Sequence, residues 1–520
     1  MLLHQPIDYH ATRRPHAPAL AAADYQWDYK TLVERSHAIA QTLLDMGVQE
    51  GERVGVLGLN SAAHLAVLLG ASRIGAVTVS ANFRLAPAEL AFVLDDAQIS
   101  VLVVTDNSID EVITETLARR EQPTRLIAGR VDAEATLAEV LKRQVAPVIR
   151  DRLLHESSPV LQLYTSGTTG KPKGAVISHR NMSSLTHMMA ISNDNIYGPG
   201  IVCLVVAPLF HIGGMGVVYI GLAQGCNNLM HEAFDPIRVV TAIQNERVAT
   251  MFMVPAMIQA IVKMVPNVRD YDFGALKLIA YGASPISVSL LEEAMDVFGC
   301  DFSQVYGMTE TTGTVIALPP EDHERALQEK PELLTSCGKA CAGNEVKIVD
   351  GDGHRVPTNE TGEICLRSAS NMVEYYNRPE ATETTIRDGW VFTGDAGFMD
   401  DEGYVYLRDR LKDMVVSGGE NIYPVEVENV LAGLPGVVEV AVIGVPDETY
   451  GEALLAFFAM KSGETVDVDS MVEFCRNKLA GYKIPRRLEL IDALPRNPSG
   501  KILKTVLREP YWKGIERRIS

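Results

Sequence analysis

The chain has 520 residues, 47% of them hydrophobic, and carries a formal net charge of −19 at pH 7. Single hydrophobic cores rarely grow beyond about 250 to 300 residues, so a chain of this length is expected to form at least two domains. The acidic balance argues against nucleic acid as the main partner and is typical of a soluble protein that repels its own copies.

The N-terminus contains charged side chains such as Asp8 and Arg13 and no uninterrupted apolar core. We therefore predict no secretory signal and expect a cytoplasmic location. The longest apolar stretch, residues 201–226, is interrupted by Pro208, His211 and several glycines. This pattern favours packed strand and loop over a transmembrane helix. The sequence leaves open both a peripheral contact with a membrane and assembly into a homodimer.

The seven cysteines lack the paired spacing of a metal site, because Cys337 and Cys341 stand four residues apart with no second pair or histidine cluster nearby. We expect reduced and mostly buried thiols.

In the first part of the chain, apolar strands alternate with amphipathic helices, which predicts a mostly parallel sheet covered by helices. The expected elements are strand 53–59, helix 62–75, strand 77–80, helix 87–95 and strand 101–105. The alternation returns in residues 199–318, with strands expected at 202–207, 249–254, 276–281 and 303–306.

Short apolar runs separated by turns at 350–353 and 400–403 dominate residues 343–406, which predicts a small antiparallel barrel. The pattern then changes to helix 424–434, strands 437–444 and 453–460, helix 468–479 and strand 487–490. This order predicts a compact α+β unit, so the fold class is α/β with a smaller α+β part at the C-terminus.

The run Tyr164-Thr-Ser-Gly-Thr-Thr-Gly-Lys-Pro-Lys-Gly174 predicts a loop around the phosphates of a nucleotide. Its glycines let main-chain N–H groups approach anionic oxygens, its hydroxyls add donors and its lysines add charge. It differs from the loop of P-loop NTPases because Gly167 and Gly170 are too close and Pro172 follows Lys171. The residues expected to contact the nucleotide are Thr165, Ser166, Gly167, Thr168, Thr169, Gly170, Lys171 and Lys173.

Further motifs follow in order along the chain. They are Tyr306-Gly-Met-Thr-Glu-Thr311, Thr393-Gly-Asp395, Asp409-Arg-Leu-Lys412, Ser417-Gly-Gly-Glu-Asn421 and Pro495-Arg-Asn-Pro-Ser-Gly-Lys501. With the phosphate loop, this set resembles the adenylate-forming enzymes, which include acyl-CoA synthetases, luciferases and peptide-synthetase adenylation domains. The resemblance implies an N-terminal domain of residues 1–411 and a mobile C-terminal domain of residues 412–520 that pivots at Lys412.

The resemblance also implies ATP, Mg²⁺ and coenzyme A as ligands. Glu310 would hold Mg²⁺, a cation that prefers oxygen ligands, and Thr309 would contact the α-phosphate. Tyr306 and the adjoining Gly307 would lie against adenine. Asp395 would accept hydrogen bonds from the ribose, with a second contact from Arg410. The expected adenine shelf consists of Gly282, Ala283 and Ser284.

Lys501 is the predicted catalyst of adenylation, because a long cationic side chain can neutralise the acyl-phosphate and then leave. His211 is predicted to lie between the acyl pocket and the tunnel for the thiol. Met215 stands where some long-chain synthetases carry a tryptophan gate. The pantetheine tunnel is expected to involve Ser417, Gly418, Gly419 and Glu420, since glycines suit a narrow passage.

We predict an acyl-CoA synthetase, with a medium- to long-chain fatty acid as the favoured substrate. Residues 476–520 carry twelve Lys or Arg against four Asp or Glu, and the coenzyme A nucleotide is expected near Lys478, Lys483, Arg486 and Arg487. The alternatives are an aromatic or other acid, and loading of a carrier protein in place of coenzyme A. Activation of an amino acid would need an acidic side chain to anchor the α-amino group, and the pocket segments show no clear one. A luciferase-type oxygenase shares the same motifs. A nucleotide-binding regulator without catalysis would require a broken phosphate loop.

Overall fold

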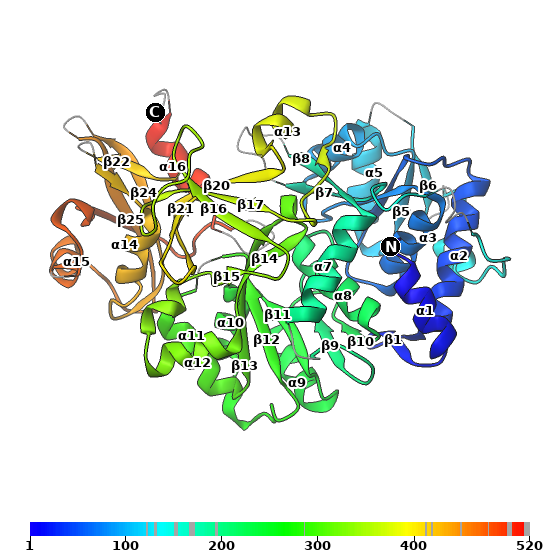
Figure 1. Cartoon of the computed structure of the whole chain (residues 1–520), viewed down its shortest axis with the longest axis horizontal. Helices are drawn as coiled ribbons and strands as arrows, with labels where there is room; N and C mark the ends of the chain where they lie inside the picture. The colour runs from blue at the N-terminus through cyan, green and yellow to red at the C-terminus, as the bar shows by residue number, and fades with distance from the viewer. Residues whose placement is uncertain are drawn as a thin grey trace.

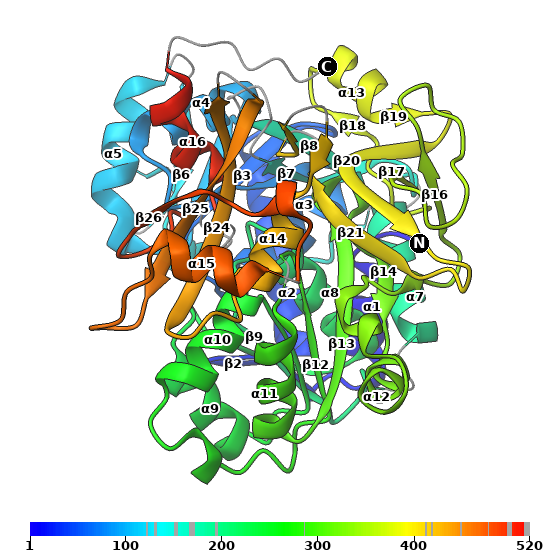
Figure 2. The ribbon, with the colours of Figure 1, turned by 90° about the vertical axis from the view of Figure 1, so that its left-hand side faces the viewer.

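The structure is a computed structural model that describes residues 1–120, 123–128, 133–149, 154–165, 172–192, 196–284, 286–410, 413–417, 420–447, 450–476, 478–496 and 502–513. At residues 107, 409, 410, 420 and 421 it describes the backbone only. In this part of the chain, three sheets form from residues up to 410 and a fourth from residues beyond 414 (Figures 1 and 2).

The first sheet is the predicted parallel sheet of the N-terminal part, in the order β18-β8-β7-β4-β3-β5-β6. Its strands are β3 (Arg53–Leu57), β4 (Val77–Ser80), β5 (Val101–Val104), β6 (Arg125–Ile127), β7 (Pro159–Thr165), β8 (Lys173–Ser178) and β18 (Glu374–Tyr375). The strands from β6 to β7 run parallel, and β8 and β18 add antiparallel pairs at one edge. The strand predicted at 77–80 matches β4 residue for residue.

Helices cover this sheet. They are α2 (Tyr29–Asp45), α3 (Ala62–Ile74), α4 (Pro87–Asp96), α5 (Asp110–Arg119), α6 (Leu137–Val140) and, against β18, α13 (Pro379–Thr385). Helix α3 begins after Ser61, whose hydroxyl accepts a hydrogen bond from the His64 N–H, and ends at Gly75 in the left-handed conformation. These two capping residues explain why the predicted helix 62–75 forms where it does.

The second sheet has the order β15-β14-β13-β12-β11-β9-β10-β1-β2. Its strands are β1 (Pro18–Ala21), β2 (Gln26–Asp28), β9 (Val202–Val205), β10 (Asn227–Met230), β11 (Thr250–Met253), β12 (Leu278–Gly282), β13 (Asp301–Met308), β14 (Gly313–Leu318) and β15 (Lys339–Ala340). Its helices are α1 (Gln5–Arg13), α7 (His179–Ser192), α8 (Ile212–Gln224), α9 (Pro236–Asn245), α10 (Pro255–Met264), α11 (Val288–Phe298) and α12 (Pro320–Gln328). Helices α7 and α8 pack against each other between the two sheets (Figure 1).

Helix α8 corrects the prediction for residues 201–226, where we expected strand and loop. The structure has strand β9 there, followed after a loop by a helix of thirteen residues. Because α8 is enclosed by α7 and the second sheet, it is apolar on nearly every side and lacks the polar stripe by which a surface helix is recognised. No helix in the described part of the chain has both the length and the apolar character needed to cross a bilayer.

The third sheet is antiparallel and curls into a half-barrel, in agreement with the small β unit predicted for residues 343–406 (Figure 2). Its strands are β16 (Glu345–Val349), β17 (Gly362–Arg367), β19 (Ile386–Arg387), β20 (Trp390–Met399) and β21 (Val405–Arg410). Gly338 joins this sheet to the second, because it forms a bridge with Val405 just before β15 begins.

The fourth sheet belongs to the predicted C-terminal α+β unit. Its strands are β22 (Val415–Ser417), β23 (Glu420–Ile422), β24 (Val437–Asp447), β25 (Gly451–Met460) and β26 (Arg487–Leu490), and its helices are α14 (Pro424–Leu431), α15 (Val468–Cys475) and α16 (Lys504–Trp512). The two apolar clusters of the unit consist of residues beyond 414 alone. The expected boundary, residues 411 and 412, lies outside the described residues.

Contacts between this unit and the remainder of the chain include a hydrogen bond of 3.2 Å from Gln259 Nε2 to the Val438 carbonyl. Beside the end of β21, a groove of about 530 Å³ separates the half-barrel from α14. Phe398 and Arg408 line one side of the groove, and Val425 and Asn429 line the other. Among the described residues, the two parts therefore meet beside this groove and share no apolar cluster.

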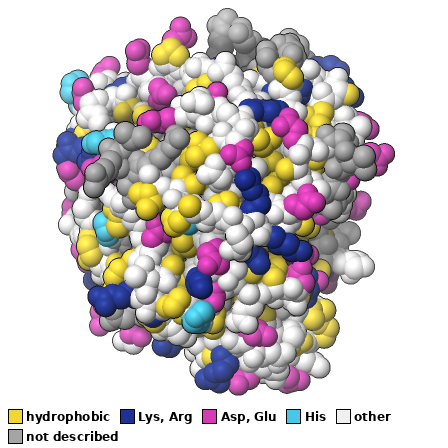
Figure 3. Space-filling model, turned by 90° about the vertical axis from the view of Figure 1, so that its right-hand side faces the viewer, with side chains coloured by type: hydrophobic (Ala, Val, Ile, Leu, Met, Phe, Trp, Pro, Cys, Tyr) yellow, Lys and Arg dark blue, Asp and Glu magenta, His cyan; other side chains and the backbone are white. Residues whose placement is uncertain are grey.

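The seven cysteines are free thiols, six of them buried, as predicted. On the face shown in Figure 3, basic side chains are interspersed among acidic ones.

The junction at Gly338 gives a test of the packing. Gly338 has a φ of +91°, and an added Cβ would lie 1.9 Å from the Ala317 carbonyl oxygen, whereas Gly343 has a φ of +82° and open space around its Cβ position. Both Gly→Ala changes carry the cost of about 1 to 2 kcal/mol for a left-handed L residue. Gly338→Ala should lose about 1 to 3 kcal/mol more through overpacking. Thermal denaturation compares the two variants, and equal unfolding midpoints would contradict the close approach of Gly338 to the Ala317 carbonyl.

Candidate active site

The phosphate loop connects the ends of two paired strands. Thr165 ends β7 and pairs with Lys173, the first residue of β8. Residues 166–171, which include Ser166, Gly167, Thr168, Thr169, Gly170 and Lys171, lie outside the described residues. The Thr165 hydroxyl lies 3.5 Å from Glu310 Oε1. The base of the loop therefore adjoins the residue predicted to bind the cation.

Glu310 stands in a tight turn between β13 and β14, within the 3-10 segment Thr309–Thr311. The Thr311 hydroxyl accepts from the Met308 N–H at 3.0 Å and donates to the Gly313 carbonyl at 2.8 Å. A Cβ on Gly307 would lie 1.7 Å from that same carbonyl oxygen, so the turn requires glycine there. These contacts fix the backbone of the turn and thereby the directions in which the Thr309 and Glu310 side chains point.

The predicted nucleoside residues come from two different sheets. Tyr306 on β13 donates a hydrogen bond of 2.8 Å to Asp395 Oδ2 on β20. Burial, followed by the nearby Asp395 carboxylate, raises the pKa of Tyr306 well above its ordinary value, so the phenol stays a donor. Asp395 pairs across the ladder with Arg410, of which only the backbone is described. The structure thus brings Tyr306, Asp395 and the strand position of Arg410 together.

The predicted adenine shelf begins at the end of β12. Gly282 pairs with Val305, and a Cβ on Gly282 would lie 2.1 Å from the Val305 carbonyl oxygen. Ala283 follows with a φ of +67°, which turns the chain sharply toward Ser284. The shelf is therefore next to the strand that carries Tyr306 and Gly307.

His211 precedes α8, and its Nε2 atom is buried without a hydrogen-bond partner in the described part of the structure. Burial, and to a lesser extent the positive charge of Arg84, lowers the pKa of His211 from 6.5 to about 4. Asn60 fixes the segment before it, because its side-chain oxygen accepts from the Leu209 N–H at 2.9 Å and its Nδ2 donates to the Ala207 carbonyl at 3.0 Å. His211 is thus a neutral ring in a fixed position.

An apolar cluster around Phe252, called here the Phe252 cluster, lies between α8 and the middle of the second sheet. Ala280 lies in the interior of β12, between two hydrogen-bonded strands, and is nevertheless only half-buried. Val217 on α8 and Val305 on β13 are also half-buried, and these side chains pack around Phe252. A Cβ on Gly213 would lie 3.1 Å from the Phe252 ring. The cluster thus combines apolar side chains with partial exposure, which makes it the candidate wall of an acyl pocket.

The model of the AMP-binding enzyme family matches residues 7–376, and that of the AMP-binding enzyme C-terminal domain matches residues 426–501. The chain belongs to this family. It is an adenylate-forming carboxylate ligase of the AMP-forming acid–thiol type, and it binds ATP and a carboxylic acid.

Relatives of this AMP-binding enzyme differ in their substrates. The chain is 37% identical to a fatty acid–[acyl-carrier-protein] ligase of Streptomyces coeruleorubidus, over 100% of this chain and 98% of the relative. It is 38% identical to a feruloyl-CoA synthase of an Amycolatopsis species, over 96% and 97% of the two chains. Among solved structures, ATP-bound MatB from Rhodopseudomonas palustris superimposes with a TM-score of 0.88 at 27% identity, over 99% of this chain and 100% of that one.

The C-terminal part of the predicted site is described only in part. Ser417 ends β22 and pairs with Glu420 at the start of β23. Only the backbone of Glu420 is described. Gly418, Gly419, Lys412 and Lys501 lie outside the described residues. The segment that contains Lys501 is closed at its base by a bridge between Arg496 and Ile502.

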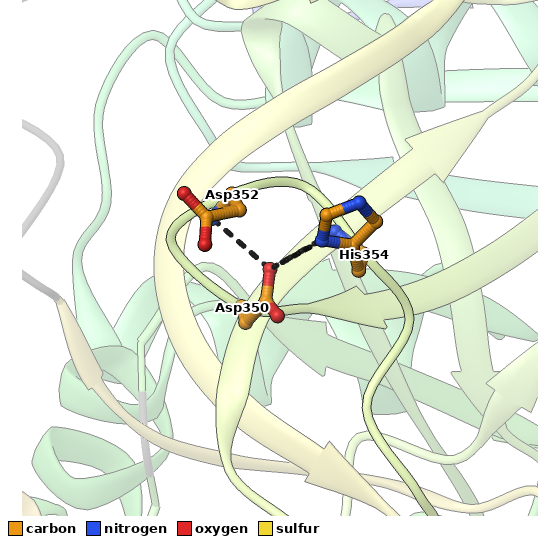
Figure 4. Close-up of side chains that lie close together, drawn as sticks. All are labelled: Asp350, Asp352 and His354. Carbon is orange, nitrogen blue, oxygen red and sulfur yellow. Dashed lines mark hydrogen bonds and ion pairs between the residues drawn. The ribbon is translucent and has the colours of Figure 1, made fainter.

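The donor set near Glu310 fits a magnesium ion. Mg²⁺ in nucleotide enzymes is usually held by one or two carboxylates together with phosphate oxygens and water, so Glu310 beside the phosphate loop suits it. A cluster of three potential metal ligands occurs elsewhere, at Asp350, Asp352 and His354 in an exposed turn after β16 (Figure 4). Asp350 Oδ1 accepts from the N–H groups of Asp352 at 3.0 Å and His354 at 2.9 Å, which explains that cluster as a turn.

The structure adds residues that the motifs did not identify. Asn60, Arg84 and Tyr375 lie far from the phosphate loop in sequence. Asn60 bonds to the segment before His211, Arg84 lies 5.9 Å from the centroid of the adjoining Phe210 ring, and Tyr375 bonds to Glu310. None of the three stands in a motif. The only feature of the sequence that could have identified them is a polar or aromatic residue beside the end of a strand.

The lowered pKa of His211 predicts its charge state. The ring should titrate near a pKa of about 4 in the folded protein, below the ordinary value of 6.5. Since the unfolded chain then binds the proton more readily, protonation of His211 should reduce stability as the pH falls from about 6.5 to about 4. NMR of protein labelled at the histidine rings measures the titration, with His211→Gln for assignment. Arg84→Met should raise the pKa, and a wild-type ring titrating near 6.5 would contradict the burial.

Proposed function

We propose that this protein is an acyl-CoA ligase that activates a carboxylic acid with ATP and transfers the acyl group to coenzyme A. The observation that carries the proposal is the placement of Glu310 in a rigid turn, between the base of the phosphate loop and the Tyr306–Asp395 pair. A nucleotide with its ribose at Asp395 and its phosphates at the loop would present the α-phosphate to this turn.

In the first step, a carboxylate oxygen of the acid attacks the α-phosphorus and pyrophosphate leaves. Thr309 would contact the α-phosphate, and Lys501 would neutralise the charge that gathers on the reacting oxygens. Glu310 would hold Mg²⁺, which supplies Lewis-acid stabilisation of the phosphates when bound. The hydrogen bond from Tyr306 holds Oδ2 of Asp395 in place, and Asp395 would accept hydrogen bonds from the ribose.

In the second step, the thiol of coenzyme A attacks the acyl carbonyl and AMP leaves. We propose that residues 412–520 rotate about Lys412 between the steps, removing Lys501 and bringing Ser417, the adjoining glycines and Glu420 to His211. The separate core of this unit and the groove beside β21 support such a movement. A neutral, buried His211 leaves the thiol tunnel without a charge that would retain water.

The basic C-terminal segment is proposed to meet the phosphates of coenzyme A. Lys483 is already paired with Glu426 at 2.7 Å, and Lys478 lies over the Phe474 ring. Arg486 and Arg487 are exposed, and no ion pair involves them in the described part of the chain. We therefore assign most of the phosphate attraction to these two arginines.

For the acid, we propose a medium- to long-chain fatty acid. We assign the acyl pocket to the Phe252 cluster, whose other members are aliphatic side chains and Met257. Methionine side chains adapt to varied apolar shapes, so Met257 would adapt to a longer acyl chain. The fatty-acid ligases among the relatives support this choice, and the feruloyl-CoA synthase keeps an aromatic acid as the alternative.

A panel of carboxylic acids tests the function. We expect ATP-dependent pyrophosphate release with fatty acids and formation of the corresponding CoA thioester. Release of pyrophosphate without a CoA thioester, together with acylation of a phosphopantetheinyl carrier protein, would replace coenzyme A by a carrier as the acceptor.

Lys501→Ala separates the two steps. The variant should lose pyrophosphate release by at least about 100-fold, the usual effect of removing a charge-stabilising donor. It should still convert synthetic acyl-adenylate and coenzyme A to the thioester. Arg496→Ala, at the base of the same segment, is the control for local damage, and loss of both half-reactions in Lys501→Ala alone would contradict the assignment.

Ala280→Leu tests the proposed acyl pocket. A larger side chain at this half-buried position should shorten the acyl group accepted, with kcat/KM falling about 10-fold or more for long chains, since each methylene excluded is worth about 1 kcal/mol. Short acids serve as the internal control and should keep their rates. Equal losses across all chain lengths would place the acyl group elsewhere.

A further inference from the structure

Tyr375 makes a contact with Glu310 that no motif predicted. Its hydroxyl donates a hydrogen bond of 2.5 Å to Glu310 Oε1, and both side chains are buried, with 6% and 5% of their surfaces exposed. The Thr165 hydroxyl lies 3.5 Å from the same oxygen. Two hydroxyl groups from the first sheet therefore converge on one oxygen of a carboxylate carried by the second sheet.

Hydrogen bonds also hold the backbone around Tyr375 in place. Tyr375 pairs with Ala175 in the ladder between β18 and β8, and the Tyr376 N–H donates to the Gly174 carbonyl at 2.8 Å. Three residues before Tyr375, the Met372 N–H donates to the Glu310 main-chain carbonyl at 2.7 Å. Residues 372–375 thus form hydrogen bonds both with the main chain of Glu310 and with its carboxylate.

Tyr375 also faces the end of the phosphate loop. The Lys173 ammonium lies 5.1 Å from the centroid of the Tyr375 ring, within reach of a cation–π contact. Tyr375 therefore stands between the last lysine of the loop and the carboxylate that the loop adjoins.

A carboxylate that binds a cation through one oxygen needs its other oxygen fixed, because free rotation of the group would move the ligand atom. Hydrogen-bonded partners of metal ligands supply this restraint, and their loss typically weakens metal affinity or activity by about 10- to 100-fold. In Glu310 the bonds to Tyr375 and Thr165 occupy Oε1. That arrangement assigns the cation to Oε2.

We propose that Tyr375, assisted by Thr165, is a positioning residue that fixes Glu310 Oε1 so that Oε2 is presented to the divalent cation of the nucleotide. The inference rests on the proposed role of Glu310 as the cation ligand. It extends that role to a strand that lies 65 residues further along the chain and pairs with the strand following the phosphate loop.

The neighbouring tyrosine provides a matched control. Consecutive residues of a strand point to opposite faces, and the Tyr376 hydroxyl donates to Gln98 Oε1 at 2.7 Å instead. Tyr375→Phe and Tyr376→Phe each remove one phenolic oxygen, from the last residue of β18 and from the residue after it, and only the first removes a donor from Glu310.

The experiment measures Mn²⁺ binding by electron paramagnetic resonance in the presence of a non-hydrolysable ATP analogue, with full-length protein. Tyr375→Phe should raise the apparent dissociation constant of Mn²⁺ by about 10- to 100-fold, whereas Tyr376→Phe should leave it unchanged. Pyrophosphate release should show the same pattern as a higher Mg²⁺ requirement, with much of kcat restored at saturating Mg²⁺. Thr165→Val, which removes the longer contact, should cause a smaller loss in the same direction.

Mn²⁺ affinity in Tyr375→Phe equal to that in Tyr376→Phe would overturn the proposal, as would a loss of kcat that Mg²⁺ does not restore. If Tyr375→Phe does not fold, wild-type affinity in Thr165→Val would overturn it. Failure of the proposed function gives a different result: no acid forms a CoA thioester, while the Mn²⁺ titrations still separate the two tyrosines.

Discussion

The buried carboxylate of Glu310 is the point on which three sheets of the structure converge. The second sheet supplies the turn between β13 and β14, and the first supplies the hydroxyls of Thr165 and Tyr375. The third sheet is linked to β13 four residues before Glu310, through the hydrogen bond from Tyr306 to Asp395. Burial of a carboxylate is costly unless hydrogen bonds satisfy it. The contacts around Glu310 therefore hold the sheets in one arrangement as well as orienting a ligand.

Close approach of main chains shapes the rest of the site. Gly282 and Gly307 each lie so near a neighbouring carbonyl that a Cβ has no room, and Gly214 in α8 lies in the same way against the Pro208 carbonyl. These glycines let strand ends and a helix N-terminus approach neighbouring main chains closely. Such an arrangement suits the proposed reaction, which depends on orienting negatively charged oxygens.

The proposed acyl pocket is the part of the site in which we expect this chain to differ from its relatives. Relatives at 33 to 38% identity are named for acids as different as fatty acids, ferulate and indoleacetate. The proposed nucleotide site depends on backbone geometry, whereas the proposed acyl pocket depends on the volumes of side chains such as Phe252 and Ala280. Volume changes there should alter the acid without disturbing the phosphate loop or the Glu310 turn.

The sequence alone determined the family, the order of many of the strands and helices and the C-terminal α+β unit, because motifs such as 164–174 and 306–311 are local and their residue types indicate their chemistry. Strands β4 and β26 were predicted residue for residue. Helix α8 was missed, since enclosure on all sides removes the periodicity that marks a helix. The partners of the motif residues, Tyr375 on Glu310 and Asn60 before His211, were decided by tertiary structure alone, because contacts across 65 to 149 positions leave no local pattern. The Phe252 cluster arises in the same way, from side chains that are ordinary in sequence and come together through packing.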